Sequence, residues 1–161
     1  MQHRLAIEKD FDEIYDLYMD RDANPYLTYD LMEKKFFWNI YMELLSTSTL
    51  FVVIIDSMMV ASYRLIPKNN RQAHIYYLGS FVTNKNLKGQ GIGTSVLKYI
   101  KEYSFITGRI RIELTVDLHN QPAIHLYKKM GFNIEGIVKK SYRLNDSGEY
   151  YDEYLMACIL S

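Results

Sequence analysis

The sequence predicts an α/β protein with a mixed sheet, and three observations lead to that prediction. First, the 161 residues suffice for one domain that buries about two thirds of the surface of its unfolded chain. Second, short β-branched runs alternate with stretches of helical periodicity. Third, a strand, a glycine-rich turn, a helix and a strand follow one another as in a βαβ unit. No repeat or linker interrupts the chain, so we expect one domain over residues 1–161.

The charge balance and the cysteine content exclude several classes of partner. Lys and Arg number 19, as do Asp and Glu, so the formal net charge is +0. Without a broad basic field, we expect no nucleic acid partner. The one cysteine, Cys158, cannot form an internal disulfide. Since Cys and His do not cluster either, the sequence predicts no metal site.

The location of the protein is predicted from segments that the chain lacks. The N-terminal residues contain no apolar stretch of signal-peptide length, and no run approaches the roughly 20 apolar residues of a membrane span. We therefore expect a cytoplasmic protein with no membrane partner. The 15 tyrosines indicate an aromatic-lined cleft or an interface, and the second alternative leaves a homodimer open.

The first third of the chain predicts one strand and two helices. Residues 3–8 have strand character. Asp10 followed by Glu13 resembles a capping box, which predicts a helix over about residues 11–20. A second helix is expected over about residues 29–45, where apolar residues occupy more than one face.

The middle of the chain predicts a hairpin and a further strand. Residues 49–55 and 58–66 are strand-like, and Asp56 and Ser57 separate them as a turn. After Pro67 and a polar stretch, residues 73–83 again have strand character. The first two of these strands are expected to form a hairpin in the middle of the sheet.

The last third predicts two helices and three strands. A helix over residues 92–107 ends at Gly108, and an alternating strand follows over residues 109–116. Asn120 is a plausible N-cap of a short helix that ends before Gly131. Two closing strands are expected at residues 132–140 and 150–160.

A glycine-rich stretch precedes the helix at residues 92–107. Gly89, Gly91 and Gly93 alternate, so their backbone amides can approach an anion closely at a helix start, with Lys88 at the edge. The spacing lacks the lysine of a Walker loop and the last step of a dinucleotide fingerprint. Taken alone, the stretch is either a cradle for a diphosphate or an ordinary flexible turn.

A second motif resolves this choice through resemblance to a known family. Together with the glycine stretch, residues 120–132 closely resemble the GNAT superfamily of acyl-CoA-dependent N-acetyltransferases. The family's diphosphate loop, Gln/Arg-x-x-Gly-x-Gly/Ala, is matched at Lys88, Gly91 and Gly93, with lysine in place of Gln or Arg. The later motif is matched at Asn120, Ala123, Leu126, Tyr127, Gly131 and Phe132. The C-terminal segment resembles the branch with ribosomal-protein, polyamine and amino-acid acetyltransferases.

The resemblance implies a fold and a reaction. The fold is the single-domain GNAT fold, with a mixed, mostly antiparallel sheet of about seven strands flanked by about four helices. The reaction is direct transfer of an acetyl group from acetyl-CoA, as co-substrate, to a primary amine in a ternary complex, without a metal. The implied cofactor-binding residues are Phe81, Val82, Lys88, Gly89, Gln90, Gly91, Ile92, Gly93, Thr94 and Asn120.

The resemblance also implies individual roles in the chemistry. Tyr127 is the implied catalytic acid that protonates the departing sulfur, although a buried tyrosine on an apolar helix face needs no such role. The amide of Val82 is the candidate donor to the oxyanion. Asn120 is implied to contact the cofactor, and a simple helix N-cap is the alternative.

The general base and the acceptor stay open. The strand at residues 73–80 offers His74 and Tyr76 but no acid, and the use of Glu113 depends on which face of its strand it occupies. His119 and His125 are interpreted as surface residues. The residues that could line an acceptor site between the N-terminal helices and the late hairpin are Tyr26, Tyr29, Glu33, Glu149 and Asp152. A small-molecule amine or amino acid is favoured over a peptide N-terminus, and an acyl-CoA-binding sensor with little turnover is the rival hypothesis.

Overall fold

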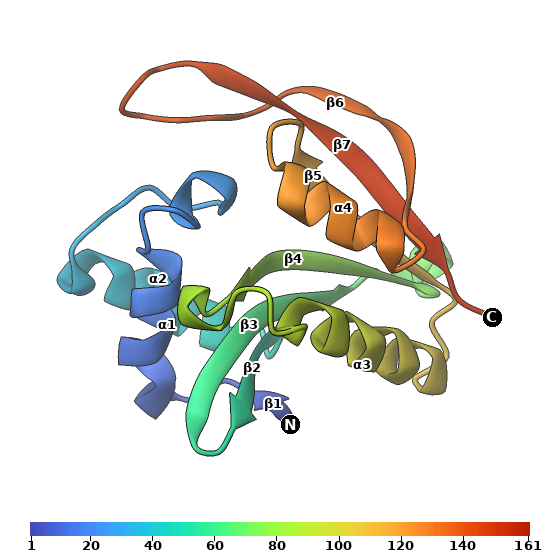
Figure 1. The fold of residues 1–161 in the computed structure, drawn as a ribbon, viewed down its shortest axis with the longest axis horizontal. Helices are drawn as coiled ribbons and strands as arrows, with labels where there is room; N and C mark the ends of the chain where they lie inside the picture. Colours follow the sequence, from blue (N-terminus) through green and yellow to red (C-terminus); the bar gives the residue numbers. More distant parts are fainter. The chain divides into compact units, whose positions relative to one another are not determined.

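A computed structural model describes residues 1–161 and contains seven strands and four α-helices (Figure 1). The strands are β1 Gln2–Leu5, β2 Leu50–Ile55, β3 Met58–Pro67, β4 Ile75–Thr83, β5 Arg111–Asp117, β6 Asn133–Arg143 and β7 Tyr150–Ile159. The helices are α1 Phe11–Tyr18, α2 Lys34–Ser46, α3 Ile92–Ile106 and α4 Gln121–Lys129. All strands belong to one sheet in the order β1-β2-β3-β4-β5-β7-β6, which confirms the predicted fold class.

The ladders confirm a mixed sheet. β4 and β5 pair in parallel from Ile75–Arg111 to Tyr77–Glu113, and α3 connects them, so the predicted βαβ unit is present. The pairs β1–β2, β2–β3, β5–β7 and β6–β7 are antiparallel. The β2–β3 turn places Asp56 at φ 47° and Ser57 at φ 65°, the left-handed pair of a tight hairpin.

Two compact units divide the chain. The first contains Met1–Leu65 and Ser80–Ile92, and the second contains Ile66–Gly79 and Gly93–Ser161. β3 and β4 each contribute residues to both units. The single domain over residues 1–161 stays a prediction.

The first unit is built around an aromatic core. Ile14, Leu17 and Tyr18 of α1 are buried at helical spacing, as the sequence predicts, and they pack with Phe37 and Tyr41 of α2. α2 begins at Lys34, later than predicted. The reason is that the buried Asn24 amide donates to the carbonyls of Tyr18 and Tyr29, both at 2.9 Å, which holds the preceding segment outside the helix.

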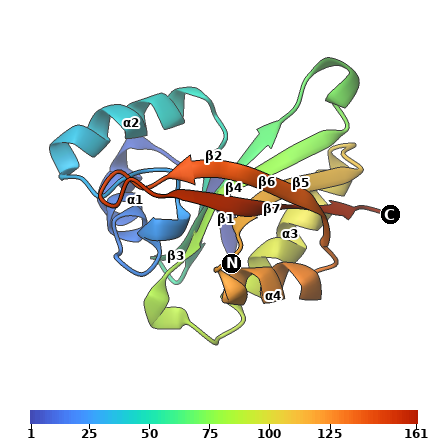
Figure 2. The same cartoon turned by 90° about the horizontal axis from the view of Figure 1, so that it is seen from above.

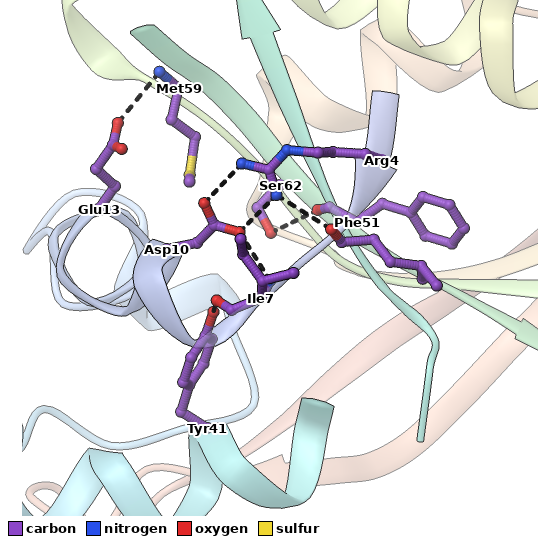
Figure 3. A network of polar contacts seen from close by, with 9 residues as sticks. Arg4, Ile7, Asp10, Glu13, Tyr41, Phe51, Met59 and Ser62 are labelled. Atoms are coloured by element: carbon purple, nitrogen blue, oxygen red, sulfur yellow. Dashed lines mark hydrogen bonds and ion pairs between the residues drawn. The ribbon is translucent and has the colours of Figure 1, made fainter. Parts of the chain in front are cut away.

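The capping box predicted at Asp10 and Glu13 is wrong. Two Asp10 oxygens accept from the Arg4 guanidinium at 2.7 and 2.8 Å, and one also accepts the Ile7 N–H at 2.8 Å (Figure 3). Glu13 accepts the Met59 N–H of β3 at 3.2 Å instead of capping its own helix. Burial raises the pKa of Asp10, but Arg4 and the Ile7 amide outweigh this effect and hold it below its usual value.

The second unit packs α3 and α4 with the C-terminal half of the sheet. Val96, Leu97 and Ile100 form the buried face of α3. β6 and β7 run side by side as a long hairpin whose register shifts between Ile134 and Gly136 and again between Val138 and Tyr142 (Figure 1, Figure 2). None of the helices of this chain has the length and apolar content that crossing a membrane requires.

Candidate functional site

The glycine-rich stretch forms a tight turn that leads into α3. Backbone bonds hold Lys88 to the carbonyl of Lys85 and Gln90 to that of Leu87, both at 3.2 Å. Gly89 and Gly91 adopt φ 82° and 77°, and a Cβ at either position would meet nothing within 4 Å. Glycine is therefore needed at both positions for the left-handed backbone and leaves open space above it. The N–H groups of these two glycines donate no backbone hydrogen bond, so they are available to an anion.

One exposed cation stands at this turn. Lys85 is paired with Asp20, whereas Lys88 is exposed and has no ion pair. Its charge is therefore free to meet a negative group above the glycine amides. The role of Lys88 at the edge of an anion cradle stays a prediction.

Glycine is required at the third position, Gly93, for a different reason than at Gly89 and Gly91. Gly93 lies in the first turn of α3, and a Cβ there would come within 2.8 Å of Leu126 Cδ2 in α4. Both residues belong to the second unit. Gly93 thus permits close packing of two helices, a constraint that the alternating glycine pattern could not reveal.

Asn120 is the N-cap of α4, as one of the two interpretations predicts. Its Oδ1 accepts the Ala123 N–H at 3.3 Å, while its side-chain Nδ2 donates to no protein group. The amide nitrogen is therefore available to a ligand without loss of the cap. Thr94, half-buried in the first turn of α3, and the neighbouring Ile92 complete the predicted residues around the helix start.

The buried Asp117 orders the turn before Asn120. The sequence did not predict this role. Its Oδ1 accepts from the His119 N–H at 2.6 Å and contacts His119 Nδ1 at 3.0 Å, while Oδ2 accepts the Tyr142 hydroxyl at 2.6 Å. Burial and the Asp117 bond raise the pKa of Tyr142. An acid after a strand gives little signal by itself, because its partners are distant in the sequence.

Tyr127 is a buried phenol whose hydroxyl has no partner. Its side chain is 7% exposed and packs on Phe132, with ring centroids 5.7 Å apart. The Tyr127 hydroxyl makes no hydrogen bond to the protein. Burial raises its pKa, so the phenol stays protonated at neutral pH and keeps a proton to give.

The end of β4 carries the predicted Phe81 and Val82 in the first unit. Val82 is buried in the aromatic core at 6% exposure and Phe81 is half-buried. Just before them, Ser80 adopts φ 47°, a left-handed conformation that a non-glycine residue holds only at a cost of roughly 1–3 kcal/mol. This left-handed residue could not be predicted, because serine in a strand pattern carries no such preference.

None of the candidate general bases is a buried group without a partner. Glu113 is almost buried and pairs with Lys68 and with Arg111. Burial raises the pKa of Glu113, but the two cations outweigh it and keep the carboxyl below its ordinary value. His74 is exposed, and Tyr76 lies under the Arg109 guanidinium at 4.9 Å.

The residues predicted to line an acceptor site belong to different units. In the first unit Tyr26 is exposed, Tyr29 is half-buried, and Glu33 pairs with Lys35 at 3.2 Å. In the second, Glu149 accepts the Tyr151 hydroxyl at 3.1 Å. Asp152 binds Lys139 at 2.9 Å and the Lys140 N–H at 2.8 Å, so it secures the β6–β7 hairpin. His119 and His125 are exposed, as predicted.

Comparison with known proteins identifies the family of this chain. The model of the acetyltransferase (GNAT) family matches residues 11–132, and the chain belongs to this family. The resemblance inferred from the two motifs is thereby confirmed.

Individual relatives are similar over part of their length. The chain is 38% identical to the L-amino acid N-acetyltransferase AaaT of Escherichia coli over 66% of this chain and 65% of that protein. It is 30% identical to the spermidine N(1)-acetyltransferase of the same species over 68% of this chain and 56% of that protein. The matched segment thus spans less than two thirds of either relative.

A solved structure matches the fold over nearly the whole chain. The spermidine N-acetyltransferase of Vibrio cholerae, in complex with CoA and spermine, superposes with a TM-score of 0.82 at 22% identity. The match covers 98% of this chain and 94% of that one. At this identity the likeness concerns the fold.

Proposed function

We propose that this protein is an N-acetyltransferase that moves the acetyl group of acetyl-CoA to the primary amine of a small molecule or amino acid. Transfer takes place by direct attack in a ternary complex. Membership of the GNAT family supports this activity, as do relatives named for acetylating amino acids and spermidine. The observation that carries the proposal is the pair of unbonded amides at Gly89 and Gly91 immediately before α3.

The turn fits the diphosphate of coenzyme A. Open space above Gly89 and Gly91 admits a bulky group to their N–H donors, and Lys88 adds a positive charge at the edge. The first turn of α3, from Ile92 through Thr94, contributes unpaired N–H groups and the positive end of a helix dipole. Asn120 would hold the cofactor through its unbonded Nδ2 while its Oδ1 caps α4.

The chain's own groups account for two needs of the transfer. Acetyl-CoA supplies a thioester, whose carbonyl carbon gains a bond to the amine nitrogen as its bond to sulfur breaks. The Val82 N–H donates to the oxygen that gains negative charge, and Phe81 contributes backbone beside it. Tyr127 then gives its phenolic proton to the departing sulfur. The attacking nitrogen loses a proton to solvent as the amide forms, and the Tyr127 phenolate regains a proton from solvent, so the protons balance.

No side chain is assigned as the general base. Glu113 is held as an anion by Lys68 and Arg111, and this pairing lowers its affinity for a proton. We therefore propose that the acceptor loses its proton to water and attacks as the neutral amine. The rate would then follow the fraction of acceptor that is unprotonated.

Release of free thiol from acetyl-CoA, measured with a panel of primary amines, tests the function. The proposal expects thiol release that depends on both acetyl-CoA and an amine. Tight binding of acetyl-CoA with no release for any amine would instead support the rival, an acyl-CoA-binding sensor. The cytoplasmic location, a homodimer and a peptide N-terminus as acceptor stay predictions.

A further inference from the structure

A second group of polar side chains in the first unit has no place in the acetyl-CoA site. We call it the Arg64 cluster. It consists of Tyr18, Tyr29, Thr49, Ser62, Arg64 and Ser80. Arg64 lies near the end of β3, Tyr29 lies between α1 and α2, and Ser80 is the left-handed residue of β4.

Arg64 is a half-buried cation without a carboxylate partner. Its Nε and Nη2 donate to the Thr49 hydroxyl at 3.3 and 3.1 Å, and it makes no ion pair. By contrast, Arg4 and Arg111 are both matched by acids of this chain. A guanidinium offers five donors in a planar fork, so Arg64 keeps donors for another group beyond those that it gives to Thr49 and Tyr29.

The Arg64 charge lies next to the aromatic ring of Tyr29. Burial raises the pKa of the Tyr29 phenol, and the neighbouring Arg64 charge opposes this rise. The Tyr29 ring stacks on that of Tyr18, with centroids 6.0 Å apart and planes at 21°. Glu43, exposed on α2, is the carboxylate whose charge acts on Tyr29, and it does not pair with Arg64.

Tyr18 brings a fully buried phenol into the same cluster. Its side chain is 0% exposed, yet its hydroxyl has no hydrogen bond within bonding geometry. The hydroxyls of Ser62 and Ser80 lie beside it. Ser62 already donates to the Phe51 carbonyl at 3.0 Å (Figure 3). Tyr18, Ser62 and Ser80 thus bring three hydroxyl groups together in the cluster that contains Arg64.

The cluster adjoins the part of β4 that the proposed reaction uses. Tyr18 packs in the same core as Val82, and Ser80 is two residues before it. The left-handed Ser80 adds backbone strain at this point, a feature that concentrates at binding and catalytic sites. A group bound at Arg64 would therefore belong to the molecule that approaches Val82.

We propose that Arg64 binds the carboxylate of the acceptor, so that the acceptor is an amino acid and not a polyamine. This inference rests on the proposed acetyl transfer and assigns the substrate class of the same site. The planar guanidinium matches a carboxylate with two parallel N–H···O bonds. A polyamine would bring a second positive charge toward Arg64, which repels it.

The test compares amino acids with their decarboxylated counterparts in the same acetylation assay. The pairs are L-leucine with 3-methylbutylamine, L-phenylalanine with 2-phenylethylamine, and L-lysine with cadaverine, and spermidine is included as a polyamine. The wild-type protein is expected to favour each amino acid by about 30-fold or more in kcat/KM, the effect of losing one buried charge pair.

Three variants assign that preference to Arg64. Arg64→Gln should raise KM for the amino acids by about 30-fold and leave KM for the decarboxylated amines within about threefold. Arg64→Lys, which keeps the charge but loses the fork, should give an intermediate preference. The control Arg71→Gln removes an exposed arginine from the second unit and should behave as wild type.

The outcomes separate this inference from the proposed function. Preference of the wild-type protein for decarboxylated amines or spermidine would overturn the inference and leave acetyl transfer standing. An equal loss for both members of each pair in Arg64→Gln would also overturn it. Absence of thiol release with every amine would contradict the proposed function itself. Should Arg64→Gln fail to fold in thermal unfolding, the wild-type preference and the Arg64→Lys variant still decide.

Discussion

Gly93 of α3 lies so close to Leu126 of α4 that a Cβ on the glycine would be 2.8 Å from Leu126 Cδ2. Gly93→Ala should force the Leu126 side chain to move and lower the free energy of unfolding by about 1 kcal/mol, because the new Cβ meets a side-chain methyl and not backbone. Chemical denaturation measures this change. Gly136→Ala is the control, because nothing lies within 4 Å of a Cβ there. Equal stability of the two variants would contradict the packing role.

Gly91 should show a different effect, because its requirement is conformational. Gly91→Ala at φ 77° should destabilise the protein by about 1–2 kcal/mol and weaken acetyl-CoA binding about tenfold, since a strained turn misplaces N–H donors to a charged group. Gly108→Ala, at φ 80° beyond the end of α3, is the matched control with the same strain outside the turn. Calorimetric titration should show weaker binding only in Gly91→Ala. A similar affinity for both variants would exclude the turn as the diphosphate site.

Glu113 is predicted to stabilise the fold and not to act as the base. Its pKa is lowered in the folded protein, so its stabilisation is present above the unfolded pKa of about 4.3 and is lost as the pH falls through the folded pKa. Glu113→Gln should therefore cost about 1–3 kcal/mol at pH 7, with the deficit shrinking toward pH 3. Acetyl transfer at pH 7 should stay within about threefold of wild type, whereas a loss of about 100-fold or more would identify Glu113 as the missing base.

Tyr127 is predicted to act through its hydroxyl and not through its packing. Tyr127→Phe keeps the ring against Phe132 but removes the proton donor, so kcat should fall by about 100-fold or more. The dissociation constant of acetyl-CoA should change little. Tyr99→Phe removes a phenol from α3, where the ring stacks on Tyr103, and should retain wild-type kcat. Unchanged turnover in Tyr127→Phe would leave this residue with a structural role alone.

The sequence predicted the elements because their periodicity is local, and it failed where a distant partner decides. The strip of Ile14, Leu17 and Tyr18 is readable along α1 itself. The predicted role of Asp10 was wrong because its carboxylate forms an ion pair with Arg4 of β1. Helix α2 begins late because the Asn24 amide holds the chain before it.

In the candidate site, too, the features with local causes could be predicted and those that depend on distant residues could not. The left-handed turn at Gly89 and Gly91 and the cap at Asn120 depend on residue types with strong local preferences, so the motifs could reveal them. The left-handed backbone at Ser80 and the absence of an ion pair at Arg64 depend on which side chains the fold brings near them. No spacing in the sequence carries that information.

Transfer of an acetyl group to an amine leaves two products, and both can be measured in one reaction. Mass spectrometry of a reaction with acetyl-CoA and an amino acid acceptor, run beside a thiol assay, measures both products. We expect one N-acetylated amine for each free coenzyme A thiol and no thiol without the amine. Saturable binding of acetyl-CoA with neither product, for any amine tested, would contradict it.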